Sequence, residues 1–103
     1  MQLTGKCKEE FREYLLNGIV DASYAYRHFI TLPKSMRYGV LEDYFDSVGV
    51  IIEIKIQTNL RYNYGIHDKI EWLFYSRFFS DRNLAKDASV EKANELRNEV
   101  LNK

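Results

Sequence analysis

The spacing of apolar residues changes its period at Gly49. In residues 34–48 the apolar positions recur every three or four residues, which is the spacing of one helix face. From Val50 to Gln57 inward apolar residues alternate with mostly polar ones, which is typical of a half-buried strand. Gly49 favours the end of a helix, because a residue without a Cβ adopts positive φ at little cost. The junction therefore predicts a helix that leads directly into a sheet.

The helix before Gly49 is predicted to begin near Pro33 and Ser35, residues that suit a helix start. Its predicted core face consists of Met36, Val40, Leu41, Tyr44, Phe45 and Val48. Its predicted solvent face consists of Glu42, Asp43, Asp46 and Ser47. The inward positions of the following strand are Val50, Ile52, Ile54 and Ile56. Both elements have one apolar face, so both are expected to be covered on that side.

Two helices are predicted before this one. The first runs from about Gly5 to Leu16, with Thr4 as its cap and Asn17-Gly18 as its stop. Its predicted core face consists of Cys7, Phe11, Tyr14 and Leu15. Residues 19–32 fit a short helix from Asp21 through Phe29 and fit extended chain equally well, and we predict the helix.

Two further strands are predicted after the turn signal Thr58-Asn59. One places Leu60, Tyr62, Tyr64 and Ile66 on a single face. The other runs from about Ile70 to Phe79, with Ile70, Trp72, Phe74 and Phe78 inward and Glu71, Leu73, Tyr75 and Arg77 outward. The links between the strands are too short for a parallel crossover, so the three strands form an antiparallel meander.

The last helix is predicted to begin after Ser80 or Asp81 and to continue towards Leu101. Its predicted core face consists of Ala85, Ala88, Ser89, Ala93, Leu96 and Val100. The whole pattern predicts a single α+β domain over residues 1–103. It has N-terminal helices, a three-stranded antiparallel meander and a C-terminal helix packed on one sheet face, an α-β-β-β-α core.

The composition of the chain indicates its cell compartment and the classes of partner that it is expected to bind. Fifteen basic and fifteen acidic residues cancel, so the chain lacks the positive field of a strong nucleic-acid binder. No apolar run is long enough to span a membrane, and the N-terminal residues have no signal-like apolar core. Cys7 is the single cysteine and cannot form an internal disulfide. These features predict a cytoplasmic protein without a membrane partner.

We find no constellation that predicts catalysis. Glu42 and Asp46 lie one helical turn apart, but a solvated acidic face explains them better than a metal site. His67 and Asp68 are neighbours in a predicted turn. We interpret His28 as a surface imidazole and Cys7 as a small core residue. No nucleophile elbow, phosphate loop or metal-binding motif occurs. We therefore expect no catalytic residue, metal or cofactor, and no enzyme activity.

The chain has eight tyrosines, more than one small core readily hides. Aromatic side chains at a surface suit protein interfaces. The predicted partner surface consists of Tyr62, Tyr64, Leu73 and Tyr75. The sequence therefore predicts a non-enzymatic module that binds an unknown protein partner or a second copy of itself as a homodimer.

The stretch "DRNLAKDAS" at the start of the last helix, together with the helix–three strands–helix order, resembles the double-stranded-RNA-binding domain. That resemblance implies that Arg82 and Lys86 contact phosphates and that Gly65-Ile66-His67 matches a loop containing Gly and His. In this chain the Gly-His stretch precedes the third strand, whereas in the family it precedes the second. The alternative function is thus nucleic-acid binding. Its predicted phosphate contacts are Lys55, Arg61, Arg77, Arg82 and Lys86.

Three stretches, "LTGKCKEEF", "LPKSMRYGVLEDYFDSVG" and "DRNLAKDASVEKANELRNE", resemble a family of small uncharacterised proteins from phages and prophages of Bacteroidota. The family has no known biochemical role. The resemblance implies a setting, a bacterial cytoplasm and a mobile element, and no activity.

Overall fold

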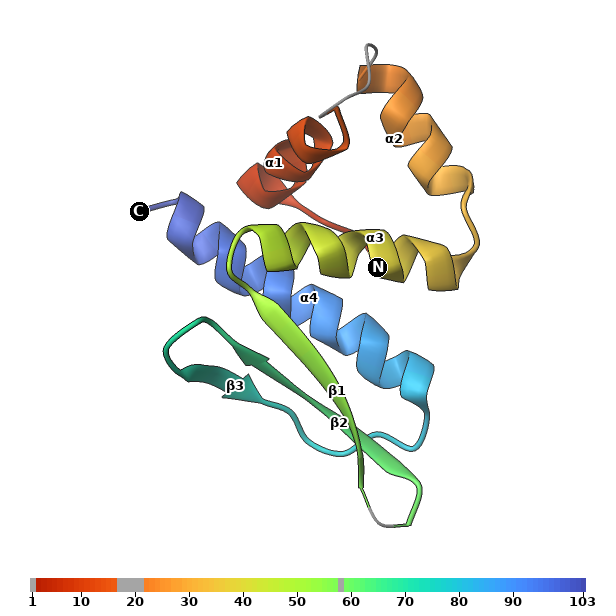
Figure 1. The fold of residues 1–103 in the computed structure, drawn as a ribbon, viewed down its shortest axis with the longest axis vertical. Coiled ribbons are helices and arrows are strands. Elements are labelled where there is room, and N and C mark those ends of the chain that lie inside the picture. The colour runs from red at the N-terminus through yellow and green to blue at the C-terminus, as the bar shows by residue number, and fades with distance from the viewer. Residues whose placement is uncertain (1, 17–21, 58) are drawn as a thin grey trace.

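The computed structural model of the chain describes residues 2–16, 22–57 and 59–103. In these residues four helices and three strands follow one another (Figure 1). They are α1 (Gly5–Leu16), α2 (Ala22–Thr31), α3 (Lys34–Ser47), β1 (Ile51–Gln57), β2 (Arg61–His67), β3 (Trp72–Tyr75) and α4 (Arg82–Leu101). The predicted helix stop at Asn17-Gly18 and the predicted cap at Asp21 lie outside the described residues.

The three strands form an antiparallel sheet in the order β1-β2-β3. Helix α4 packs on β2 and β1, and α3 packs on β1, so the helices cover one face of the sheet. In Figure 1 the helices occupy one end of the molecule, and the β1–β2 hairpin extends away from them. The predicted α+β class and the meander are confirmed. The described part of the segment 19–32, which fitted either helix or strand, contains the helix α2, and this helix ends at Thr31 instead of Phe29.

Aromatic rings from the first three helices form the centre of the core. Phe11 meets Phe29 and Tyr44 edge to face, with ring centres 4.9 and 5.2 Å apart. Tyr44 lies 4.9 Å from Phe45, and both are fully buried. The sheet contributes Ile66, which is also fully buried. Edge-to-face contacts of this kind add to the free energy gained from burial alone.

Local signals at the helix ends were predicted in part. The N-cap of α3 is Pro33, with no side-chain hydrogen bond, so Ser35 does not cap this helix. Gly49 has φ +80° after α3, and Asp81 caps α4 by accepting a hydrogen bond from the N–H of Asn83 at 2.6 Å. Contrary to the prediction, Thr4 does not cap α1 with its side chain. The N–H of Cys7 in the first turn of α1 donates to Asn98 of α4 at 2.8 Å instead. The start of α1 is therefore capped by another helix.

The predicted core face of α3 was wrong at its N-terminal end. Met36 is exposed, and Tyr38 is buried in its place. The reason is that this end of α3 faces α4, where the Lys86 ammonium lies 4.9 Å from the centre of the Tyr38 ring. Glu42, predicted to face solvent, is half-buried and accepts a hydrogen bond from the Tyr38 hydroxyl at 3.4 Å. Burial raises the pKa of the Glu42 carboxyl.

Several residues of the other elements that were predicted to face inward are exposed: Ile56, Ile70, Trp72, Phe78 and Val100. Leu60, which was predicted on one face with Tyr62, Tyr64 and Ile66, is exposed as well. Ile56 is the penultimate residue of β1, next to the turn of the β1–β2 hairpin. That hairpin extends away from the helices (Figure 1). Ile70 and Phe78 lie outside β3, which is shorter than predicted. Trp72 changes face because the pairing of β2 with β3 shifts between Ile66 and His67.

Candidate binding surfaces

The face of the sheet opposite the helices carries a group of side chains that we call the outer-face cluster. It consists of Glu53, Lys55, His67, Trp72 and Tyr75. The Lys55 ammonium lies 4.6 Å from the Trp72 ring centre and 5.5 Å from the Tyr75 ring centre. The two rings are 4.8 Å apart, and the exposed fractions of Trp72 and Tyr75 are 41% and 54%. The cluster presents aromatic surface and charge together, as protein interfaces do.

Gly65 provides the space for this cluster. A Cβ at Gly65 would lie 2.7 Å from Cζ3 of Trp72, so the indole rests directly on the strand. Sequence reasoning placed Trp72 in the core and missed it as a site residue. The glycine inside a strand was the available signal, because it often marks a close approach of another group.

The predicted partner surface is divided between the two faces of the sheet. Leu73 and Tyr75 are exposed, and Tyr62 is half-buried. Tyr64 is buried, with Phe74 and Phe79 rings 5.8 and 6.1 Å away. Tyr64 is thus a core residue and is unable to contact a partner, because its register pairs it with the inward-facing Ile54.

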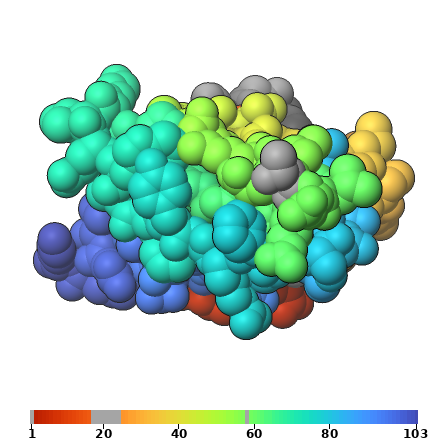
Figure 2. Space-filling view, turned by 90° about the horizontal axis from the view of Figure 1, so that it is seen from below, coloured from red at the N-terminus to blue at the C-terminus, as the bar shows by residue number. Residues whose placement is uncertain are grey.

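Strand β1 forms one edge of the sheet and is seven residues long. Among the described residues, no backbone hydrogen bond from another segment reaches its outer edge. It contains no proline, and its pairing with β2 has no bulge. Ile56 near its end is 64% exposed. Long regular edge strands of this type are templates for pairing with another chain. Figure 2, seen from the hairpin end, shows that the strand region forms most of this side of the molecule.

The structure does not bring the predicted phosphate contacts together. Lys55 and Arg61 belong to the outer sheet face. Arg77 lies after β3, with its guanidinium 5.6 Å from the Phe79 ring centre, in a hollow beside α4. Arg82 and Lys86 lie at the start of α4. The stretch Gly65-Ile66-His67, which resembled a loop, is part of β2.

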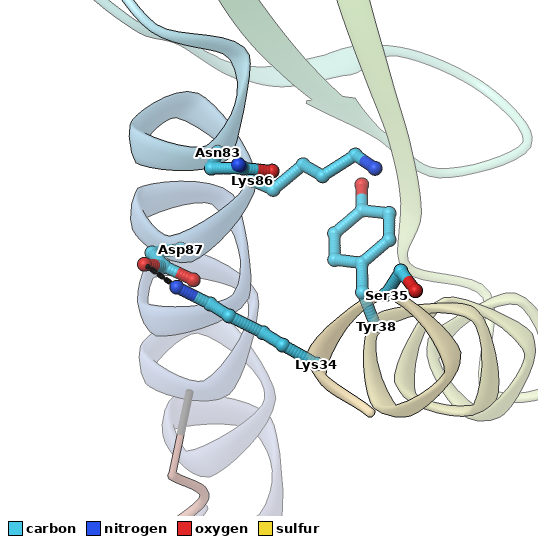
Figure 3. Close-up of a pocket in the computed structure, with 6 residues that line it drawn as sticks. All are labelled: Lys34, Ser35, Tyr38, Asn83, Lys86 and Asp87. Carbon is cyan, nitrogen blue, oxygen red and sulfur yellow. Dashed lines mark hydrogen bonds and ion pairs between the residues drawn. The ribbon is translucent and has the colours of Figure 1, made fainter. Parts of the chain in front are cut away.

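A hollow of about 140 Å³ lies between the first turns of α3 and α4 (Figure 3). Lys34 crosses it and pairs with Asp87 at 2.7 Å, and the Lys86 ammonium lies over the Tyr38 ring. Burial raises the pKa of the Tyr38 hydroxyl to about 12. Lys34 is thus paired with a carboxylate of the same lining, and both contacts join α3 to α4.

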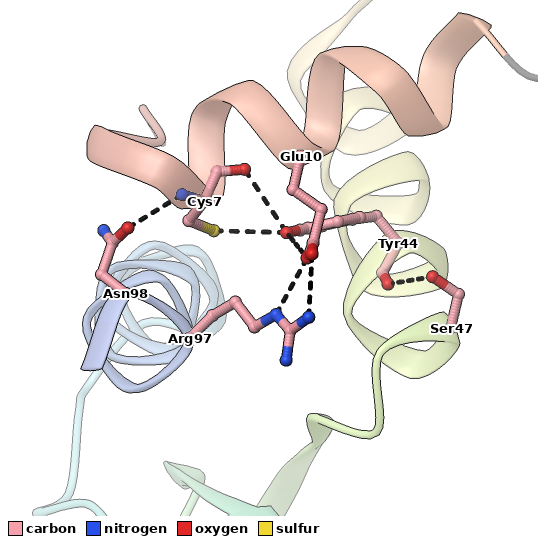
Figure 4. Close-up of polar contacts among 6 residues, drawn as sticks. All are labelled: Cys7, Glu10, Tyr44, Ser47, Arg97 and Asn98. Atoms are coloured by element: carbon pink, nitrogen blue, oxygen red, sulfur yellow. Dashed lines mark hydrogen bonds and ion pairs between the residues drawn. The ribbon is translucent and has the colours of Figure 1, made fainter. Parts of the chain in front are cut away.

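A second polar group joins α1, α3 and α4 inside the fold (Figure 4). Arg97 donates two hydrogen bonds of 2.8 Å to the Glu10 carboxylate, and Tyr44 donates one of 2.8 Å to the same group. The bond from Arg97 holds the pKa of Glu10 below its usual value. Burial raises the pKa values of Tyr44 and of the Cys7 thiol. Cys7 is fully buried, and the hydrogen bonds of this group join the three helices.

Of the remaining candidate residues, Asp68 has a structural role. The Asp68 carboxylate accepts hydrogen bonds from the N–H groups of Ile70 and Glu71 at 2.7 and 2.8 Å, which forms the predicted turn. His28 is exposed on α2. In the part of the chain that the structure describes, no group of three or more His, Cys, Asp or Glu side chains is arranged to hold a metal ion.

The same described part contains no helix long and apolar enough to span a membrane. Comparison of the sequence with family models and curated proteins, and of the fold with solved structures, finds no match.

Proposed function

We propose that this protein is a non-enzymatic interaction module that pairs with a second copy of itself along β1. The observation that carries the proposal is the regular edge of β1, to which no other described segment is paired. Addition of a strand to such an edge is a common mode of protein recognition. The resemblance to phage proteins implies the setting of this pairing, which would be a bacterial cytoplasm and a mobile element.

The charges of β1 favour one register of pairing. A twofold axis through Ile54 sets Glu53 of each copy opposite Lys55 of the other. Axes through Glu53 or Lys55 would set two like charges directly opposite, which is destabilising. A register displaced by one residue would place the inward residues of one copy against the outward residues of the other. The strand is therefore complementary to itself when the axis passes through Ile54.

The same register explains the exposure of Ile56. Antiparallel pairing about Ile54 sets Ile56 opposite Ile52 of the second copy, and Ile52 lies under the helices of its own chain. The helical layer of the second copy would then extend towards Ile56. Full burial of an isoleucine side chain contributes roughly 1.5–3 kcal/mol per copy. The exposed end of the hairpin is thus the part that the dimer would cover.

Sedimentation equilibrium over a range of concentrations tests the pairing. We expect the wild-type mass to double as concentration rises. Glu53→Lys or Lys55→Glu alone should raise the dissociation constant about tenfold, because each creates two like-charge pairs across the axis. The double variant E53K/K55E restores opposite charges and should restore the dimer.

Lys69→Glu, in the turn after β2, is the matched charge control and should leave the mass unchanged. A monomer at every concentration would overturn the proposed function. A dimer that is insensitive to both single variants would assign the interface to another surface.

A second candidate function is nucleic-acid binding. One observation favours it, the position of Lys55 beside two exposed rings, because aromatic rings next to a cation suit stacking of unpaired bases. A titration with single-stranded and duplex nucleic acid at low and physiological salt tests it, since phosphate contacts weaken as salt rises. Absence of binding at low salt would exclude this candidate.

A further inference from the structure

A hollow of about 350 Å³ between α1, α2 and α3 has an unusual lining. Its walls include the apolar side chains of Phe29, Ile30 and Leu41 and the cations Lys8 and Arg37. The described residues that line it include no carboxylate, whereas three other hollows contain Asp87, the pair Glu10 and Glu13, or the pair Glu91 and Glu95. The charge of this lining is therefore positive.

Arg37 supplies a second, independent observation. Its Nε–H is buried and has no hydrogen-bond acceptor within the described part of the chain. A buried donor without a partner costs about 1–3 kcal/mol, and a native fold rarely retains one without a reason. An acceptor supplied by a ligand would remove this cost.

Arg12 brings a further positive charge close to Tyr26, one of the lining residues. The Arg12 guanidinium lies 4.4 Å from the Tyr26 ring centre, and the Lys8 ammonium lies 5.7 Å from it. Tyr26 is itself part of the lining. Cations held on an aromatic ring remain available to an anion on their other side.

We propose that this hollow binds a small amphipathic carboxylate, a molecule with one anionic head and an apolar body. The carboxylate would lie between Lys8 and the Arg37 guanidinium, whose Nε–H would turn towards it, and the apolar body would rest on Phe29, Ile30 and Leu41. The volume falls at the lower end of the range for small-molecule sites. The hollow belongs to the helical layer, so the proposal is independent of pairing along β1.

An NMR titration with octanoate tests this proposal, with 1-octanol and octylammonium as probes of the same length. We expect octanoate to bind in the millimolar range or tighter, as its size allows, and the other two to bind at least tenfold more weakly. Amide shifts should concentrate in residues 26–41, while the indole N–H of Trp72 on the outer sheet face stays unchanged. Equal binding of octanol, or shifts centred on Trp72, would overturn the proposal.

Two variants and a control test whether octanoate binds beside Arg37 and Ile30. Arg37→Gln should weaken octanoate binding about tenfold and leave octanol unchanged. Ile30→Glu, at a position 51% exposed, should abolish octanoate binding and improve that of octylammonium. Lys34→Gln removes a cation from the hollow between α3 and α4 and should have no effect. Normal octanoate binding by folded Arg37→Gln and Ile30→Glu variants would refute the site.

Discussion

Phe45 on α3 and Ile56 on β1 are both apolar residues in regular patterns, yet Phe45 is fully buried and Ile56 is 64% exposed. The difference arises from which helices and strands cover each side chain. Phe45 belongs to the buried cluster to which α1, α3 and the sheet contribute. Ile56 lies next to the end of β1, and the β1–β2 hairpin extends away from the helices (Figure 1). Core residues are concentrated in the helical layer and in the sheet beneath it. The hairpin and the outer sheet face hold exposed apolar surface, which is available for binding.

The largest expected effect tests this division directly. Phe11→Ala removes a fully buried ring that contacts Phe29 and Tyr44, and should lower the free energy of unfolding by about 3–5 kcal/mol. Trp72→Ala removes a larger ring from the outer sheet face and should cost about 1 kcal/mol. Urea unfolding followed by circular dichroism measures both. Equal costs would show that the two regions do not differ in the way proposed.

The second prediction concerns the ion pair between Arg97 and Glu10. Arg97→Met leaves Glu10 in a partly buried site without its cation and should cost about 1–3 kcal/mol at neutral pH. The pKa of Glu10 is lowered in the folded state, so its contribution is fully present above the usual value of 4.5 and is lost as pH falls through the lowered pKa. Unfolding free energy measured from neutral to acid pH should therefore fall less steeply in the variant.

Lys92→Met is the control for this pair, since Lys92 and Glu95 form a more exposed ion pair within α4. Its cost should be less than about 1 kcal/mol. The same pH dependence in Arg97→Met and wild type would contradict the assignment to Glu10.

The third prediction compares two glycines, and it tests the junction that joins the two regions. Gly49 has φ +80° and open space around its Cβ position, so Gly49→Ala should cost about 1 kcal/mol through backbone strain alone. Gly39 lies inside α3, also with open space, and Gly39→Ala should stabilise by roughly 0.5–1 kcal/mol. Thermal unfolding of both variants measures the opposite signs. A neutral Gly49→Ala would exclude strain at the junction.

The accuracy of the sequence predictions depended on whether the signal was local or came from a distant part of the chain. Signals with a local cause were read correctly: the glycine that ends α3, the aspartate that caps α4, and the bounds of α1. Signals that depend on distant parts of the chain were not. Thr4 was replaced as a cap by Asn98, which lies at the other end of the chain. A local pattern does not reveal which other element supplies a hydrogen-bond partner.

The candidate site was predicted only in part for a related reason. Tyr75 was expected to be exposed, but Trp72 was placed inside because strict alternation was assumed through β3. The shift of register at His67 moves Trp72 to the outer face. The exposure of Ile56 depends on where the helices end in space, which the alternation of β1 does not encode. Charge complementarity within β1, by contrast, can be read from the sequence once β1 is known to be an edge.

The smallest expected effect on stability comes from Gly65→Ala. This substitution should displace Trp72 of the outer-face cluster and leave the rest of the fold intact. The added Cβ would lie 2.7 Å from the Trp72 ring, and the ring can swing outward because it is 41% exposed. The cost should therefore stay at or below about 1 kcal/mol, the lower end for a steric clash. Trp72 emission should shift to the red and acrylamide quenching should increase, while Gly39→Ala leaves both unchanged. Since the substitution does not touch the edge of β1, the dimer should persist, and its loss would show that the outer-face cluster also supports the pairing.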